Sequence, residues 1–168
     1  MAKLIDLMTY FCQHYPHPDD LSVGRLTKMV YLADWRSAIT RSQQMTQIPW
    51  HFDHYGPYVR RIREVAETNP EHFAIDSLNT RLGNPKKVVR LRAPRRSRVA
   101  EQAMTEDERG ILDHVIRTTQ DLGWGDFIKL VYSTYPILME PRYSSLDLVE
   151  LAARYKAEKE LIDQRRSA

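Results

Sequence analysis

Apolar residues recur at a helical spacing through the first forty residues of the chain. Residues 3–15 predict a first helix, which Pro16 ends because proline removes a backbone donor. A second helix is predicted over about 22–40, after polar residues whose side-chain oxygens can cap it. Its main apolar stripe consists of Val23, Leu26, Met29, Val30 and Ala33. Because apolar residues also occupy much of its remaining circumference, this second helix is expected at the centre of the fold.

The spacing changes to an alternation after the second helix. Residues 45–55 predict an extended strand. Pro49 places that strand at a sheet edge, or interrupts it, because proline cannot donate to a ladder. Gly56 and Pro57 then predict a turn, with Pro57 at the first position of a surface helix over about 57–69. The central helix is therefore followed by an aromatic strand that stops at a Tyr-Gly-Pro sequence.

A hairpin and three helices account for the rest of the chain. Residues 72–92 predict a β-hairpin that turns at Gly83-Asn84-Pro85. Helices are expected over about 106–121, 125–134 and 145–165. The elements together predict a mainly α (α+β) fold, in which about six helices surround the buried central helix beside a small antiparallel hairpin or sheet. A length of 168 residues fits a single domain, 1–168.

The last three helices carry terminal signals. Thr105 and Glu108 form a capping-box pattern at the start of the first. Pro136 is expected to end the second. Ser144 or Ser145 is expected to cap the third. The apolar stripe of this last helix consists of Leu148, Leu151, Ala152, Tyr155 and Ile162.

The net charge of +3 has its source in one short segment. Residues 81–104 contain eight Lys or Arg and one acidic residue, Glu101. Three interpretations are open: a charged edge strand, a surface that docks an acidic protein, or phosphate contacts in a nucleic-acid-binding accessory protein. The last would use residues 81–98, which lack base-stacking aromatics. Its candidate residues are Lys86, Lys87, Arg90, Arg92, Arg95, Arg96 and Arg98.

The central helix has a second, unusual side. At the helical rotation of about 100° per residue, Gly24, Lys28, Tyr31 and Trp35 cluster within about 60°. Lys28 either packs its stem on the aromatic rings while its ammonium reaches water, or contributes to a binding surface.

The sequence LTKMVYLADW, followed by a polar link, an aromatic strand and YGPYV, resembles the Panacea or SocA-like antitoxin domain. The matching positions are Lys28, Tyr31, Ala33, Asp34, Tyr55, Gly56 and Pro57. The resemblance is most specific over about residues 20–65. It implies an antitoxin-like protein that neutralises a cognate protein toxin by direct binding and has no enzyme activity of its own. A homodimer and a toxin–antitoxin hetero-oligomer are both compatible with this role.

The predicted partner-binding surface joins the unusual side of the central helix to the strand and turn that follow it. Aromatic and cationic residues of this kind are typical of interface hot spots. The proposed members are Lys28, Tyr31, Asp34, Trp35, Trp50, His54, Tyr55, Gly56 and Pro57.

Catalytic and metal sites find little support. On a strand, His51 and His54 point to opposite faces and cannot share one ion. A hydrolase that uses His51, Asp53 and His54 would need a pocket that gathers them. We therefore predict no catalytic residues, no metal and no cofactor. With one cysteine, no signal-peptide pattern and no apolar run near the ~18 residues that span a bilayer, a cytoplasmic protein without membrane contact is expected.

Overall fold

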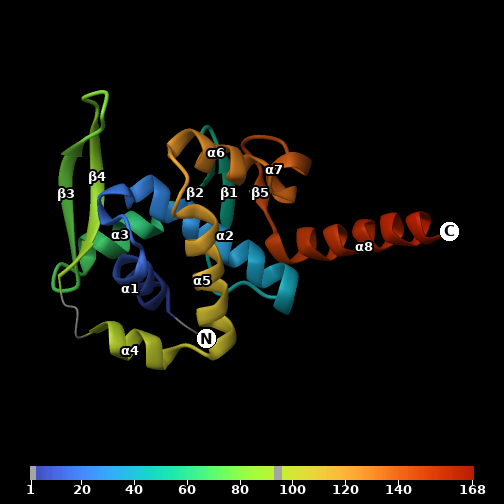
Figure 1. Cartoon of the computed structure of the whole chain (residues 1–168), viewed down its shortest axis with the longest axis horizontal. Helices are drawn as coiled ribbons and strands as arrows, with labels where there is room; N and C mark the ends of the chain where they lie inside the picture. Colours follow the sequence, from blue (N-terminus) through green and yellow to red (C-terminus); the bar gives the residue numbers. More distant parts are fainter. Residues whose placement is uncertain (1–2, 93–95) are drawn as a thin grey trace.

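The computed structural model describes residues 3–92 and 96–168 (Figure 1). Within these residues it contains eight α-helices and five short strands, which confirms the predicted α+β class. The helices are α1 (Leu4–His14), α2 (Val23–Arg41), α3 (Arg61–Thr68), α4 (Arg96–Ala103), α5 (Glu106–Thr119), α6 (Trp124–Tyr132), α7 (Tyr135–Met139) and α8 (Leu148–Ser167). The strands are β1 (Trp50–Asp53), β2 (Gly56–Tyr58), β3 (Phe73–Asn79), β4 (Pro85–Leu91) and β5 (Ser145–Leu146). None of the helices in the described ranges combines the length and the apolar character needed to cross a membrane.

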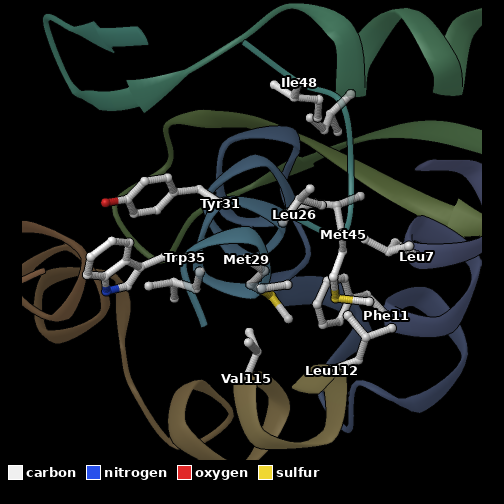
Figure 2. Close-up of a cluster of buried hydrophobic side chains, with 14 of the residues drawn as sticks. Leu7, Phe11, Leu26, Met29, Tyr31, Trp35, Met45, Ile48, Leu112 and Val115 are labelled. Carbon is white, nitrogen blue, oxygen red and sulfur yellow. The ribbon is translucent and has the colours of Figure 1, made fainter. Parts of the chain in front are cut away.

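The predicted central helix is α2. Ser22 caps it by accepting a hydrogen bond from the Arg25 amide (3.0 Å), and it ends at Ser42, whose φ is +57°. Figure 2 shows its side chains reaching α1 on one side and α5 on another, with Met29 between them. Because nearly every side of α2 is covered, its burial supplies much of the apolar area that stabilises the fold.

The strand after α2 is shorter than predicted, and the turn lies elsewhere. Residues 45–49 are not part of a strand, and the chain reverses at His54 and Tyr55. The prediction of a turn at Gly56-Pro57 was wrong, because both residues belong to β2, where Pro57 pairs with Phe52. Proline is tolerated there since β2 is the edge strand of the order β2-β1-β5. The following helix accordingly begins at Arg61 rather than at Pro57.

The β3–β4 hairpin confirms the prediction for residues 72–92, with antiparallel pairing from Phe73↔Leu91 to Asn79↔Pro85. The second side of β4 is also paired, because the Val89 amide donates to the Leu21 carbonyl (2.9 Å). The segment before α2 therefore covers part of β4. One interpretation of the basic residues was that their charge protects this strand as an exposed sheet edge.

Three short elements were not predicted. Within the basic segment, α4 begins at Arg96 and packs against α1. Pro136 does not end α6, which already stops at Tyr132; it lies instead in the first turn of α7. β5 pairs with β1 through Leu146.

The last helix, α8, leaves the body of the molecule (Figure 1). Its cap is Asp147, which accepts from the Glu150 amide (3.0 Å), rather than Ser144 or Ser145. Of its side chains only Leu148, Leu151 and Ala152 are buried, and Ile162, at the far end of the predicted stripe, is exposed.

Candidate functional site

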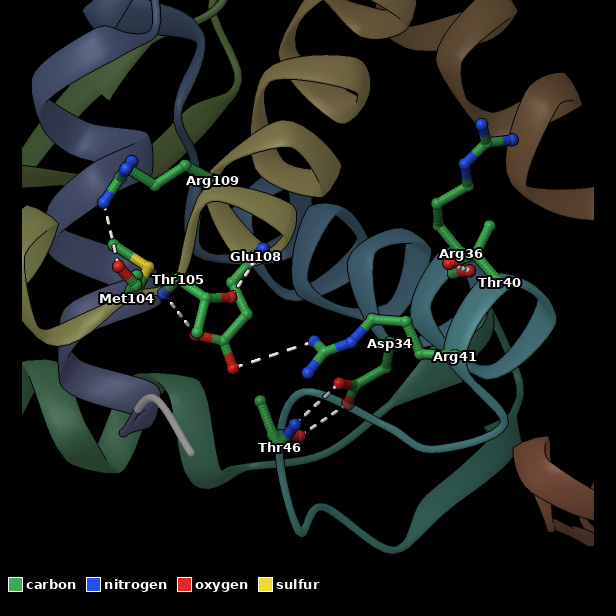
Figure 3. Close-up of polar contacts among 9 residues, drawn as sticks. All are labelled: Asp34, Arg36, Thr40, Arg41, Thr46, Met104, Thr105, Glu108 and Arg109. Carbon is green, nitrogen blue, oxygen red and sulfur yellow. Dashed lines mark hydrogen bonds and ion pairs between the residues drawn. The ribbon is translucent and has the colours of Figure 1, made fainter.

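Asp34 anchors the segment between α2 and β1. Its carboxylate accepts from the Thr46 amide (2.8 Å), the Trp50 indole N–H (2.8 Å) and the Gln44 side-chain amide (3.3 Å), and also from the Thr46 hydroxyl. Figure 3 shows the paired contacts between Asp34 and Thr46. Burial raises the pKa of Asp34, and the hydrogen bonds oppose that shift. These donors fix the start of β1 against the central helix.

A second polar contact fixes the end of α2. Arg41 Nη1 lies 3.7 Å from the Glu108 carboxylate, which also accepts from the Thr105 amide (2.9 Å) in the predicted capping box (Figure 3). Both ends of the segment from Ser42 to Pro49 are therefore held in place. The Arg41 contact holds the end of α2, and the Asp34 contacts hold the start of β1.

Three aromatic members of the predicted surface, Tyr31, Trp35 and Trp50, lie inside the protein. The Tyr31 ring meets the Trp50 ring edge-on at 5.5 Å, and the Tyr31 and Thr134 hydroxyls are 2.8 Å apart. Trp35 stacks on Tyr135 with ring centroids 6.4 Å apart. Burial raises the pKa of Tyr31. The helices that follow β1 thus cover the side of α2 from which these rings project.

Lys28 is also enclosed, with 4% of its surface exposed. Among residues 3–92 and 96–168, no side chain or carbonyl forms a hydrogen bond or ion pair with its ammonium group. Burial lowers its pKa from the usual value of 10.5. The ammonium nitrogen is not among the fully enclosed atoms that lack a partner, so it keeps some contact with solvent, but burial of the side chain still makes its charged form less favourable.

An exposed group remains at the end of the sheet. Tyr55 is 76% exposed and its ring centroid lies 4.5 Å from that of His54. His54 Nδ1 is 3.0 Å from the hydroxyl of Tyr143, which is 61% exposed. We call His54, Tyr55 and Tyr143 the aromatic turn. Of the predicted surface, only His54 and Tyr55 are exposed, while Gly56 and Pro57 are buried beneath them.

Tyr143 was not among the predicted residues. Its amide donates to the Phe52 carbonyl (2.6 Å), and its φ of +68° turns the chain just before β5 pairs with β1. No local sequence pattern connects residue 143 to residue 54. Tyr143 lies beside His54 because β5 pairs with β1.

The model of the antitoxin SocA-like family, Panacea domain, matches residues 26–136. The chain belongs to this family. No curated protein and no solved structure matches the chain. The matched segment contains most of α2, the first two strands and the hairpin, so the match to the Panacea domain covers His54 and Tyr55 but not Tyr143.

The basic residues of this Panacea domain are partly engaged. Arg90 pairs with Asp19 (2.7 Å) and Asp76 (2.8 Å), and both contacts raise its pKa. Lys86 lies 3.7 Å from Asp20. Lys87 donates to the Ser77 hydroxyl (2.6 Å). These contacts reduce the positive charge that the hairpin can offer to phosphates.

The other candidate nucleic-acid residues are spread along the chain after the hairpin. Arg92 and Arg98 have exposed side chains. Arg95 lies outside the described residues, and the side chain of Arg96 is not among those described.

Metal ligands are not gathered in the part of the Panacea domain that the structure describes, where no three His, Cys, Asp or Glu side chains could hold an ion together. A cavity of about 940 Å³ lies between the start of α1, residues 46–49 and α3. None of the nine predicted surface residues lines it. We base the candidate site on exposed aromatic rings rather than on this cavity, because its wide, open form fixes no particular ligand.

Proposed function

We propose that this protein is an antitoxin that neutralises a protein toxin by binding it directly, with the aromatic turn at the centre of the contact. The observation that carries the proposal is Tyr55, a large ring held 76% exposed beside His54 in a family of antitoxins. Tyrosine rings combine a large apolar area with a polar hydroxyl, which makes them frequent hot spots in protein interfaces.

The buried members of the predicted surface have a supporting part in this proposal. Asp34 and Tyr31 both hold Trp50 at the start of β1, four residues before the turn begins at His54. Trp35 and Lys28 lie on the same side of α2, and Trp35 packs against Tyr135 at the start of α7. A turn that is already fixed loses less conformational entropy when a toxin binds, and this increases affinity.

The experiment is co-expression of the protein with the product of the neighbouring gene. We expect that product to arrest growth alone, and the wild-type protein to restore growth and form a complex. Tyr55→Ala should weaken the complex by about 2 kcal/mol, roughly 30-fold in Kd measured by calorimetry, because a central anchor is lost.

Leu82→Ala is the matched control, since Leu82 is exposed at the far end of the β3–β4 hairpin. It should leave Kd unchanged. A harmless neighbour, the absence of a complex, or equal losses for the two variants would each contradict the proposal.

A further inference from the structure

A second cavity, of about 560 Å³, lies where the segment before α2, the tip of the β3–β4 hairpin and the start of α6 meet. Its volume falls in the range of roughly 300–1,000 Å³ that is typical of small-molecule sites. It is remote in sequence from the aromatic turn, and the proposed toxin contact uses none of its residues.

Arg25 lines this cavity and carries a positive charge whose position is fixed by hydrogen bonds. It is 3% exposed, and its guanidinium stacks on the Phe127 ring at 4.4 Å. Nε donates to the Tyr15 hydroxyl (3.0 Å), and Nη2 donates to the carbonyls of Thr119 (2.8 Å) and Leu122 (2.7 Å).

The remaining nitrogen of Arg25, Nη1, has no partner among residues 3–92 and 96–168. It forms no hydrogen bond there, and no carboxylate of these residues forms an ion pair with the side chain. Nη1 is nevertheless absent from the fully enclosed polar atoms that lack a partner, so it keeps access to the cavity that Arg25 lines. The cavity therefore has a fixed donor with an uncompensated positive charge.

The hairpin adds two more cations. Arg81 lines the cavity, is exposed, and has no hydrogen-bond or ion-pair partner in the described part of the chain. Lys86 also lines it, 3.7 Å from Asp20. Three cations face a single carboxylate there, so the cavity favours an anion with more than one negative charge.

The start of α6 supplies both an anion-binding backbone and an aromatic ring. Gly123 caps α6 without a side-chain hydrogen bond, so the first amide groups of this helix are open to an acceptor. Trp124 follows directly, is 52% exposed and packs beside Gly24, where a Cβ atom would lie 3.6 Å from the indole. The stacking aromatic that is missing from the basic segment is thus present across the cavity.

We propose that this cavity binds a free nucleoside polyphosphate, with its phosphates on Arg25, Arg81, Lys86 and the α6 amides, and its base against Trp124. Multiple phosphate charges match the three cations, and a flat base matches a half-exposed indole. A cavity of about 560 Å³ suits one nucleotide rather than a strand.

The test is calorimetric titration at low salt with ATP, GTP, adenosine, inorganic triphosphate and a short single-stranded oligonucleotide. Wild-type protein should bind ATP or GTP saturably and quench the fluorescence of Trp124, and adenosine should bind far more weakly. Arg81→Ala and Lys86→Ala should each raise the Kd for the nucleotide about tenfold.

Trp124→Ala tests the contribution of the base to binding separately from that of the phosphates. It should raise the Kd for the nucleotide about tenfold and leave the Kd for inorganic triphosphate unchanged, because only the base stacks on the indole. Arg81 and Trp124 are exposed and Lys86 is half-buried, so the variants are expected to fold, and circular dichroism checks this. Arg25 is buried, so its replacement could unfold the protein and is not used as the test.

Arg117→Ala is the control for general charge, since Arg117 is exposed on α5 and does not line the cavity. It should leave the Kd unchanged. The proposal is overturned if no nucleotide binds saturably, if Arg117→Ala weakens binding as much as Arg81→Ala, or if Trp124→Ala has no effect. Tighter binding of the oligonucleotide than of ATP would also overturn it, in favour of a nucleic-acid surface.

Discussion

At the scale of single residues, Lys28 and Asp34 are ionisable side chains that α2 carries into the interior in different ways. Asp34 accepts hydrogen bonds from three residues, whereas Lys28 has no partner in the described part of the chain. Removing Asp34 leaves buried donors unsatisfied, while removing the charge of Lys28 relieves a desolvation cost. The two substitutions should therefore change the stability in opposite directions.

Asp34→Ala should lower the free energy of unfolding by about 2–4 kcal/mol, because the Thr46 amide and the Trp50 indole would lose their acceptor. Urea unfolding followed by tryptophan fluorescence measures this change. Asp163→Ala, at an exposed carboxylate on α8, is the control and should lie within about 0.5 kcal/mol of wild type. A loss below that range for Asp34→Ala would mean that water replaces the carboxylate.

Lys28→Met should raise the free energy of unfolding at pH 7 by about 1–2 kcal/mol. Burial lowers the pKa of Lys28 in the folded protein, so the charge costs most below that folded-state pKa. The cost shrinks as the pH rises towards 10.5, where the unfolded chain also loses the proton. The advantage of the variant should shrink over the same interval.

The control for Lys28→Met is Lys159→Met, at an exposed position of α8, which should show neither the gain nor its pH dependence. Toxin binding by Lys28→Met adds a separate readout. An unchanged stability at pH 7 would indicate that an unidentified anion or water already solvates the ammonium.

At the scale of elements, the β1–β2 hairpin depends on Gly56. Its φ is +97°, and an added Cβ would lie 3.2 Å from the Tyr132 ring of α6. Gly56→Ala should lower the free energy of unfolding by about 1–3 kcal/mol and weaken toxin binding, because the strained residue lies next to Tyr55. Urea unfolding and the calorimetric Kd measure the two effects.

Gly110→Ala gives the opposite expectation for the same chemical change. Gly110 lies inside α5, where an added Cβ meets nothing within 4 Å. The substitution should raise the stability by about 0.5–1 kcal/mol, because alanine restricts the unfolded chain and favours a helix. Equal effects of the two substitutions on the stability would show that the backbone at Gly56 is not constrained.

At the scale of the whole molecule, elements with strong local signals could be predicted, and elements without them could not. The helices α1, α2 and α5 and the β3–β4 hairpin follow from periodicity, caps and turn residues that lie within each segment. The elements α4, α7 and β5 have weak local signals, and β5 exists only because residues 145–146 pair with β1. Pro136 illustrates the ambiguity, since proline can end one helix or open the next.

Some residues of the candidate site could likewise be predicted from the sequence, and others could not. A helical wheel correctly grouped Lys28, Tyr31 and Trp35 on one side of α2, but could not show that later helices cover that side. His54 and Tyr55 could be predicted because they lie next to a recognisable Tyr-Gly-Pro sequence. Tyr143 and the cavity around Arg25 could not, since each joins segments far apart in the chain.

The projecting helix α8 has a practical consequence for experiments on this protein. A helix of 20 residues is about 30 Å long, and the side chains beyond Lys156 are exposed. The hairpin and the free end of α8 lie at opposite ends of the molecule (Figure 1). A fluorophore attached near Gln164 would therefore extend into solvent on a ready-made spacer, away from the side chains that hold the core together.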